Sequence, residues 1–137
     1  MKQGVKKPYN PVLGELFRCE WTYANGTRAF YLAEQVTHHP PSSAYVYASP
    51  ENGILIQGEI HPKSKFLGNS AATIMEGGSR ISLASHPNEV YEITNPNVYA
   101  RGILFGTMFM ELGDSAVVKC EETDLICELE FKVKVRK

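Results

Sequence analysis

The 137-residue chain lacks long apolar runs and an excess of either charge. No stretch approaches the roughly 20 consecutive apolar residues that a membrane-spanning helix needs. Its 14 basic and 15 acidic residues give a formal net charge of −1. This balance provides no general attraction to nucleic acid or to an anionic membrane, so any anion site must be local. We therefore expect no nucleic-acid partner.

Cysteines are few, and nothing in their spacing is typical of a metal site. Cys19, Cys120 and Cys127 are an odd number, and the start of the chain lacks the apolar core of a signal peptide. A cytosolic, reducing compartment is the expectation. The chain contains no repeat, linker or low-complexity tract. With 43% hydrophobic residues, residues 1–137 are expected to form a single domain.

Apolar residues recur with a period of two far more often than with a period of 3.6, which predicts β-strands. The clearest case is the C-terminus, where apolar and charged residues alternate and Ile126 is the exception. Its apolar series is Leu125, Cys127, Leu129, Phe131, Val133 and Val135. A strand with one apolar and one charged side is typical of an antiparallel sheet with one face in water.

A hairpin is predicted at Asn25-Gly26, because this dipeptide lies between strand-forming residues 17–24 and 27–32. A two-residue loop would place Trp21 opposite Phe30 and Cys19 opposite Leu32, on one apolar face.

Further strands are expected over residues 44–48, 54–61, 65–75, 79–84, 90–94, 107–112 and 116–120. The turns between them are expected at residues 52–53, 61–62, 77–78, 86–88, 95–97 and 113–114. A short helix over 69–75 is the alternative for that segment. About eight strands in consecutive order predict a mainly β fold, an antiparallel meander that curls and encloses a cavity.

Residues 34–41, Glu-Gln-Val-Thr-His-His-Pro-Pro, place two histidines against two prolines. Proline fixes its own φ and disfavours helix in the preceding residue, so His39 is expected in a stiff, extended segment. The two imidazoles can donate hydrogen bonds to a polyanion such as phosphate. The alternative is a histidine pair packed at an ordinary surface turn.

This octapeptide resembles the EQVSHHPP motif of the oxysterol-binding-protein-related lipid-transfer family, with Thr37 in place of serine. Residues 6–15, Lys-Lys-Pro-Tyr-Asn-Pro-Val-Leu-Gly-Glu, resemble the second hallmark of that family, KKPxNPxLGE. Residues 62–70 and 102–106 are similar to two further blocks. The four matches occur in the family's order and cover nearly the whole chain.

The resemblance implies an incomplete lipid-binding β-barrel with a hydrophobic tunnel and an N-terminal lid. Residues 1–137 would be the central portion of that domain, lacking the lid and the C-terminal half. Candidates for the tunnel lining are Tyr31, Tyr45, Tyr47, Ile54, Ile56 and Phe66. A barrel wall without its remaining strands exposes edges and apolar lining, which predicts self-association.

The resemblance also implies the site residues. Lys7, Asn10, His38 and His39 would bind the headgroup of phosphatidylinositol 4-phosphate. Ser64 would contact the headgroup of a second lipid, phosphatidylserine, in the branch of the family that exchanges these two lipids; sterol is the competing ligand. Glu34 and Gln35 could orient a histidine or a loop amide, and Glu15 could act in a similar way. No catalytic residue, cofactor or metal is implied.

The expected function is transfer of lipids between membranes by a non-enzymatic, cytoplasmic protein that is peripheral at membranes or membrane contact sites. One alternative is a non-catalytic β interaction module without lipid. The other is a metalloenzyme with zinc on His38 and His39, completed by His61 or His86. Against it, successive residues of an extended chain point to opposite sides, and the spacing H-x-x-x-H is absent.

Overall fold

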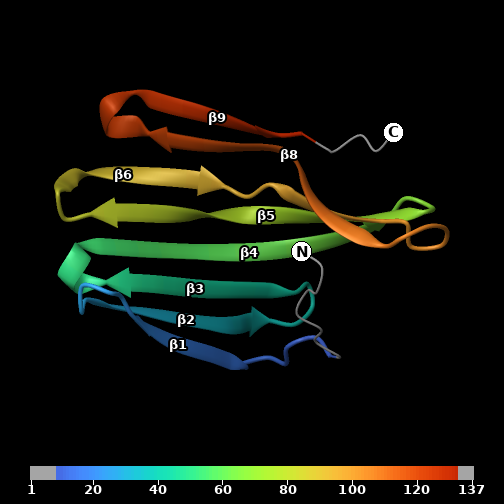
Figure 1. Ribbon diagram of the computed structural model, residues 1–137, viewed down its shortest axis with the longest axis horizontal. Coiled ribbons are helices and arrows are strands. Elements are labelled where there is room, and N and C mark those ends of the chain that lie inside the picture. Colours follow the sequence, from blue (N-terminus) through green and yellow to red (C-terminus); the bar gives the residue numbers. More distant parts are fainter. Residues whose placement is uncertain (1–8, 133–137) are drawn as a thin grey trace.

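The computed structural model describes residues 9–132, which form one antiparallel sheet of nine strands (Figure 1). The strands are β1 (Leu16–Thr22), β2 (Arg28–Thr37), β3 (Ser42–Ser49), β4 (Ile54–Phe66), β5 (Ser70–Leu83), β6 (His86–Thr94), β7 (Asn97–Arg101), β8 (Phe109–Cys120) and β9 (Leu125–Phe131). Two single-turn 3-10 helices, η1 (Pro50–Asn52) and η2 (Glu121–Thr123), connect β3 to β4 and β8 to β9. The predicted mainly β, antiparallel class is confirmed.

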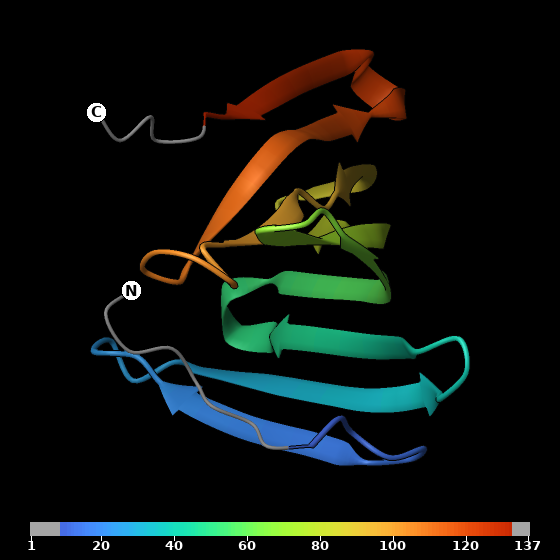
Figure 2. The ribbon, with the colours of Figure 1, turned by 90° about the vertical axis from the view of Figure 1, so that its right-hand side faces the viewer.

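The strands follow one another as a meander. β6 and β7 both pair with β5 on one side and with β8 on the other, so they act as one strand interrupted at Asn95-Pro96. Proline has no N–H for a ladder, which explains a break at this point. The sheet is curved (Figure 2). Within residues 9–132, β1 and β9 form its two edges and do not pair with each other.

The hairpin between β1 and β2 forms at the predicted place, but the predicted register is wrong by one residue. Trp21 pairs with Ala29 and Cys19 with Tyr31. The loop has three residues, since the Tyr23 carbonyl accepts the Gly26 N–H and the Tyr23 N–H donates to the Thr27 carbonyl, both at 2.9 Å. Gly26 adopts φ 82°, as the last residue of such a loop requires. Trp21 therefore shares a face with Tyr31 instead of Phe30.

Several predicted boundaries are also wrong. Residues 65–75 are not one strand, because a turn at residues 67–69 separates β4 from β5. The alternative helix over 69–75 is wrong as well, since β5 begins at Ser70. The turns expected at 61–62 and 77–78 lie inside strands, where Pro62 pairs with Met75 and Gly77 with Ile60.

The turn expected at residues 113–114 lies inside β8. Asp114 adopts φ 64°, a left-handed conformation within the strand. Its carboxylate accepts hydrogen bonds at 2.7 Å from the Asn97 amide and the Tyr99 hydroxyl of β7. These two bonds lower the pKa of Asp114. Local side-chain bonding of this kind lets the strand continue through a bend.

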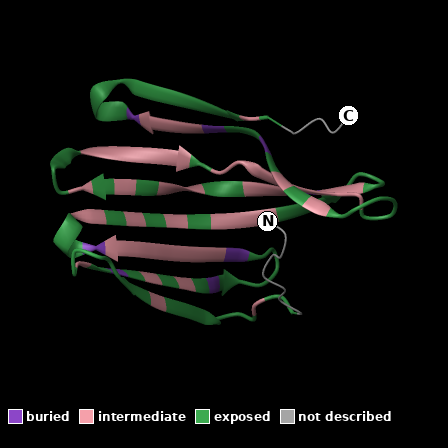
Figure 3. Cartoon of the chain, viewed as in Figure 1, coloured by how far each residue is buried: buried purple, intermediate pink, exposed green. Residues whose placement is uncertain are grey.

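The sheet has almost no closed core (Figure 3). Among the described residues, the buried apolar side chains are Ala29, Ala72, Ala116 and Cys120. The alternation in β9 predicted that its apolar side would be buried. This is wrong for Leu125 and Leu129, which are exposed. Val133 and Val135 lie outside the described residues. The described residues thus form a single-layer sheet without a second layer to bury its apolar side chains.

Candidate functional site

The two histidines lie together on the turn between β2 and β3. The β2 ladder ends at Thr37, whose hydroxyl donates to the Pro40 carbonyl across the turn at 2.7 Å. The His39–Pro40 peptide bond is cis. Both imidazoles are exposed, and their ring centroids are 4.4 Å apart. The two rings therefore form one cluster of donors, and the expectation that they point to opposite sides is wrong for this turn.

Gln35 holds this turn in place through side-chain hydrogen bonds to residues on both sides of it. Its side chain is only 5% exposed, its amide donates to the Thr37 carbonyl at 2.7 Å, and its amide oxygen accepts from the Ser43 hydroxyl at 2.6 Å. A buried amide with both ends bonded fixes its neighbours, because breaking either bond would leave a desolvated polar group. Sequence reasoning gave Gln35 an orienting role but missed Ser43; its partner position across the hairpin was the available signal.

Gln35 also joins the turn to the N-terminal motif. The Gly14 N–H donates to the Gln35 carbonyl at 2.8 Å, and the Gln35 N–H donates to the Glu15 carbonyl at 3.1 Å. The Val12 N–H donates to the Glu15 carboxylate at 3.0 Å, which closes the turn of residues 12–15. The two motifs therefore lie side by side along β2. Asn10 is exposed just before this turn, whereas Lys7 lies outside the described residues.

Ser64 lies near the C-terminal end of β4, is exposed and pairs with Thr73 of β5. The register runs from Gln35 through Ser43 to Ile60, so these three side chains share one face of the sheet. Ser64 is four positions beyond Ile60 on the same strand and faces the same side. β4 is two strands from β2, a separation of about 10 Å.

The predicted lining residues do share this face, which we call the aromatic face. The register aligns Tyr31 with Tyr47 and Ile56, and the remaining candidates occupy equivalent positions on β3 and β4. Ring centroids are 6.0 Å apart for Tyr31–Tyr45 and 6.2 Å for Trp21–Tyr47. Burial raises the pKa of Tyr31, and the neighbouring Tyr45 and Cys19 add to the shift. This face is therefore partly desolvated although no other element of residues 9–132 covers it.

The opposite face carries a shallow depression of about 640 Å³ with charged walls. Glu92 lies 2.9 Å from both Arg80 and Lys119 there, and hydrogen bonds from Lys119 and Arg80 lower its pKa. The described residues that line this depression include none of the predicted site residues. Arg80, Glu92 and Lys119 are thus paired with one another, and the fourth charged residue of the lining, Glu59, lies 3.3 Å from His61.

The histidines proposed for zinc are dispersed. His61 lies on the opposite face, where its Nε2 atom is 3.3 Å from Glu59, and His86 begins β6 at the other end of the sheet. Within residues 9–132, no three or more His, Cys, Asp or Glu side chains are grouped so that they could hold a metal ion. The same residues include no helix with the length and apolar character to span a membrane.

Comparison with known sequences places residues 1–137 under the family described as oxysterol-binding protein. The oxysterol-binding protein-like protein OBPa of Candida albicans is 54% identical over 133 residues, which cover 96% of this chain and 31% of the relative. Human oxysterol-binding protein-related protein 8 is 45% identical over 133 residues, covering 96% of this chain and 15% of the relative. The chain thus spans less than a third of either protein.

Two solved structures resemble this fold. The Osh1 ORD domain in complex with ergosterol has 31% sequence identity and a TM-score of 0.77, over 93% of this chain and 30% of that one. The Osh3 ORD of Saccharomyces cerevisiae in complex with PI(4)P has 26% sequence identity and a TM-score of 0.70. The match covers 85% of this chain and 30% of that one. The meander therefore matches part of a larger domain in each case.

Proposed function

The chain belongs to the oxysterol-binding protein family, and we propose that it is the central portion of a lipid-binding domain that transfers lipids between membranes. In this proposal it exchanges phosphatidylinositol 4-phosphate for a second lipid and performs no covalent chemistry. It works as a cytoplasmic protein, peripheral at membranes or membrane contact sites. The observation that most supports it is the convergence of the two motifs on Gln35.

The turn of residues 38–41 supplies the chemistry for a phosphorylated headgroup. The imidazoles of His38 and His39 are adjacent and open to solvent, so two donors can reach one anion. Asn10 adds an amide donor and Lys7 a compact cation from the neighbouring motif. The bonds from Gln35 and Thr37 hold the turn in place, which reduces the entropy lost when a headgroup binds.

The aromatic face is where the acyl chains would lie. Each buried methylene contributes about 0.8 kcal/mol, so two chains need an extensive apolar surface that excludes water. Tyr31, Tyr45 and Tyr47 provide such a surface along the strands that lead away from the turn, with Ile54 and Ile56 on the adjoining strand. A charged headgroup at the rim and apolar chains against the face satisfy the opposite solvation needs of a phospholipid.

The second lipid is proposed to be phosphatidylserine, with sterol as the competing ligand. Ser64 lies on the same face of the sheet as Gln35 and is exposed, which suits a hydroxyl contact with a serine headgroup. The Osh1 relative was solved with ergosterol and with cholesterol, which supports the sterol reading. Replacing Ser64 with alanine should weaken phosphatidylserine loading and leave sterol loading unchanged.

The decisive experiment is extraction of phosphatidylinositol 4-phosphate from liposomes by a variant with His38→Ala and His39→Ala. Both side chains are exposed, so the fold should persist while two charge-assisted donors are lost. Each such contact contributes about 1.5–3 kcal/mol, which predicts a loss of extraction of at least tenfold. His86→Ala, also exposed but at the other end of the sheet, is the matched control.

Unchanged extraction by the double variant would refute the headgroup assignment. A purified protein that carries no lipid in native mass spectrometry and takes none from liposomes would instead favour the non-catalytic interaction module.

A further inference from the structure

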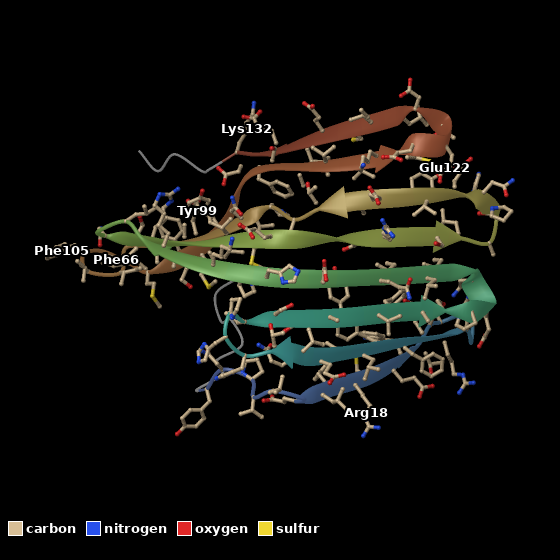
Figure 4. All side chains as sticks on the ribbon, turned by 180° about the vertical axis from the view of Figure 1, so that it is seen from behind. Arg18, Phe66, Tyr99, Phe105, Glu122 and Lys132 are labelled. Atoms are coloured by element: carbon tan, nitrogen blue, oxygen red, sulfur yellow. The ribbon has the colours of Figure 1, made fainter. Side chains whose placement is uncertain are left out.

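One end of the sheet carries an exposed apolar tip, formed by the β4–β5 turn and the β7–β8 loop. Phe66 and Phe105, from the two segments, lie close together at this end (Figure 4). Phe105 is 79% exposed, Met108 68%, Phe66 65% and Leu104 61%. The full apolar tip is Phe66, Leu67, Ile103, Leu104, Phe105 and Met108. Large apolar side chains gathered in this way on one projection indicate a contact surface.

Asn69 satisfies the backbone of the β7–β8 loop. Its carbonyl accepts the N–H groups of Gly102 and Ile103, and its side-chain oxygen accepts those of Leu104 and Phe105 at 2.9 Å. Its amide donates to the Phe105 carbonyl at 3.1 Å. One residue thus pairs five polar groups of the loop. Backbone polar groups must be paired internally before a segment can enter an apolar medium, and Asn69 meets this condition for the part of the loop from Gly102 to Phe105 that carries the exposed Leu104 and Phe105 side chains.

The charge pattern of the tip distinguishes a bilayer from an ordinary protein partner. Among residues 64–70 and 102–110, Lys65 is the one charged residue, and no carboxylate is present. An apolar projection with a single flanking lysine matches the interfacial layer of a membrane, where the apolar groups lie below the phosphates and the cation lies beside them.

The position of the tip fits the same partner. β3 and β4 last pair at Ser43 and Ile60, and β4 continues six residues further to Phe66, an overhang of about 20 Å. The turn with His38 and His39 leaves the sheet at this same end, where β2 stops (Figure 1). The tip therefore projects past the candidate headgroup site.

We propose that the apolar tip inserts into the interfacial layer of a phospholipid bilayer and sets the headgroup turn against the membrane surface. The inference rests on the proposed lipid-transfer function for its choice of partner. It assigns a membrane-contact role to Phe66, Leu104 and Phe105, with Asn69 as the residue that keeps the loop backbone paired.

The test is flotation of the chain with vesicles of phosphatidylcholine and phosphatidylserine that contain no inositide. The variant Leu104→Ser with Phe105→Ser is expected to lower the bound fraction by about tenfold or more. The matched control is Leu55→Ser with Ile126→Ser, which lie off the aromatic face at the opposite end of the sheet and are 37% and 68% exposed. Equal losses in the two variants would overturn the proposal, because binding would then follow total apolar exposure.

A second variant separates backbone pairing from apolar area. Asn69→Ala leaves every apolar side chain of the tip in place but removes three of its hydrogen bonds. We expect vesicle binding to fall severalfold, whereas full binding by this variant would contradict the assigned role of Asn69. Because these vesicles contain no inositide, flotation measures insertion separately from inositide extraction, so failure of extraction and failure of insertion remain distinguishable.

Insertion depth can be read directly. Trp21 is the one tryptophan of the chain, so Phe105→Trp in a Trp21→Phe background provides a single reporter. Its emission should shift to the blue on vesicle addition and be quenched by brominated lipids, whereas Ile126→Trp in that background should not respond. Emission already blue-shifted without vesicles, together with a concentration-dependent oligomer, would show that a second copy covers the tip and would overturn the proposal.

Discussion

At the scale of single residues, the candidate site depends on a buried amide more than on the residues that would touch a ligand. Gln35 bonds through its side chain to Thr37 and Ser43 and through its backbone to Gly14 and Glu15. Thr37, Gly14 and Glu15 belong to the two proline-containing motifs, and Ser43 lies two residues after one of them. The position of the histidines is therefore coupled to the N-terminal segment through a single side chain and its peptide groups.

Gln35→Met tests this coupling, since methionine has a similar volume but makes neither side-chain hydrogen bond. Losing both should lower the free energy of unfolding by about 1–3 kcal/mol. It should also weaken phosphatidylinositol 4-phosphate binding, although Gln35 is buried and would not itself touch the headgroup. Urea unfolding and a binding titration measure the two effects. Gln57→Met, an exposed position on β4, is the control and should change neither quantity.

Loss of stability without loss of affinity would show that Gln35 supports the fold alone. Ser43→Ala removes one of the two bonds and should give an intermediate result in both measurements.

The site residues were predictable to different degrees. His38 and His39 were identified by their prolines, and the structure brings their rings together. Asn69 was not identified, because its role depends on the β7–β8 loop, 33 or more residues away, and sequence spacing carries no signal for such a contact. Asn10 and Ser64 remain predictions of ligand contact.

At the scale of elements, the alternation of apolar and polar residues predicted the strands well. The positions of glycine and proline predicted the strand ends poorly. Glycine and proline were interpreted as turns at Pro62, Gly77-Gly78 and Gly113-Asp114, yet all lie inside strands. In a strongly curved sheet these residues serve the curvature: Gly77 adopts φ 98° within β5 and Asp114 φ 64° within β8. The local signal was real, but its cause was a bend and not a chain reversal.

Gly77→Ala should therefore be far more damaging than an alanine at an ordinary turn glycine. A Cβ at Gly77 would lie 2.3 Å from the Glu59 carbonyl oxygen, in addition to the strain of its positive φ. Gly26 has φ 82° with nothing within 4 Å of its Cβ position. We expect Gly26→Ala to cost about 1–2 kcal/mol of unfolding free energy and Gly77→Ala clearly more, because backbone must shift. Thermal unfolding of both variants measures the difference, and equal costs would show that no clash arises at Gly77.

At the scale of the whole molecule, the sheet exposes more surface than a compact protein of its size. Its accessible surface is 10430 Å², whereas a compact chain of 15.3 kDa is expected to expose about 7,100 Å². The excess of roughly 3,300 Å² is greater than either partner contributes to a standard protein interface. An antiparallel sheet usually buries one face, and residues 9–132 place no second layer on the aromatic face (Figure 2).

The last prediction concerns what covers the aromatic face when no lipid is present. Purified free of lipid, the chain should self-associate, because a second copy is then the only apolar surface available. Leu125→Ser with Leu129→Ser, on the aromatic side of β9, should weaken association, whereas Ile126→Ser on the opposite side should not. Sedimentation velocity across a concentration series measures this, and added phospholipid should shift the distribution toward monomer, since lipid and a second copy compete for the same surface. A monomer at every concentration without bound lipid would mean that the aromatic face is stable in water, and the case for a lipid-covered sheet would lose its physical basis.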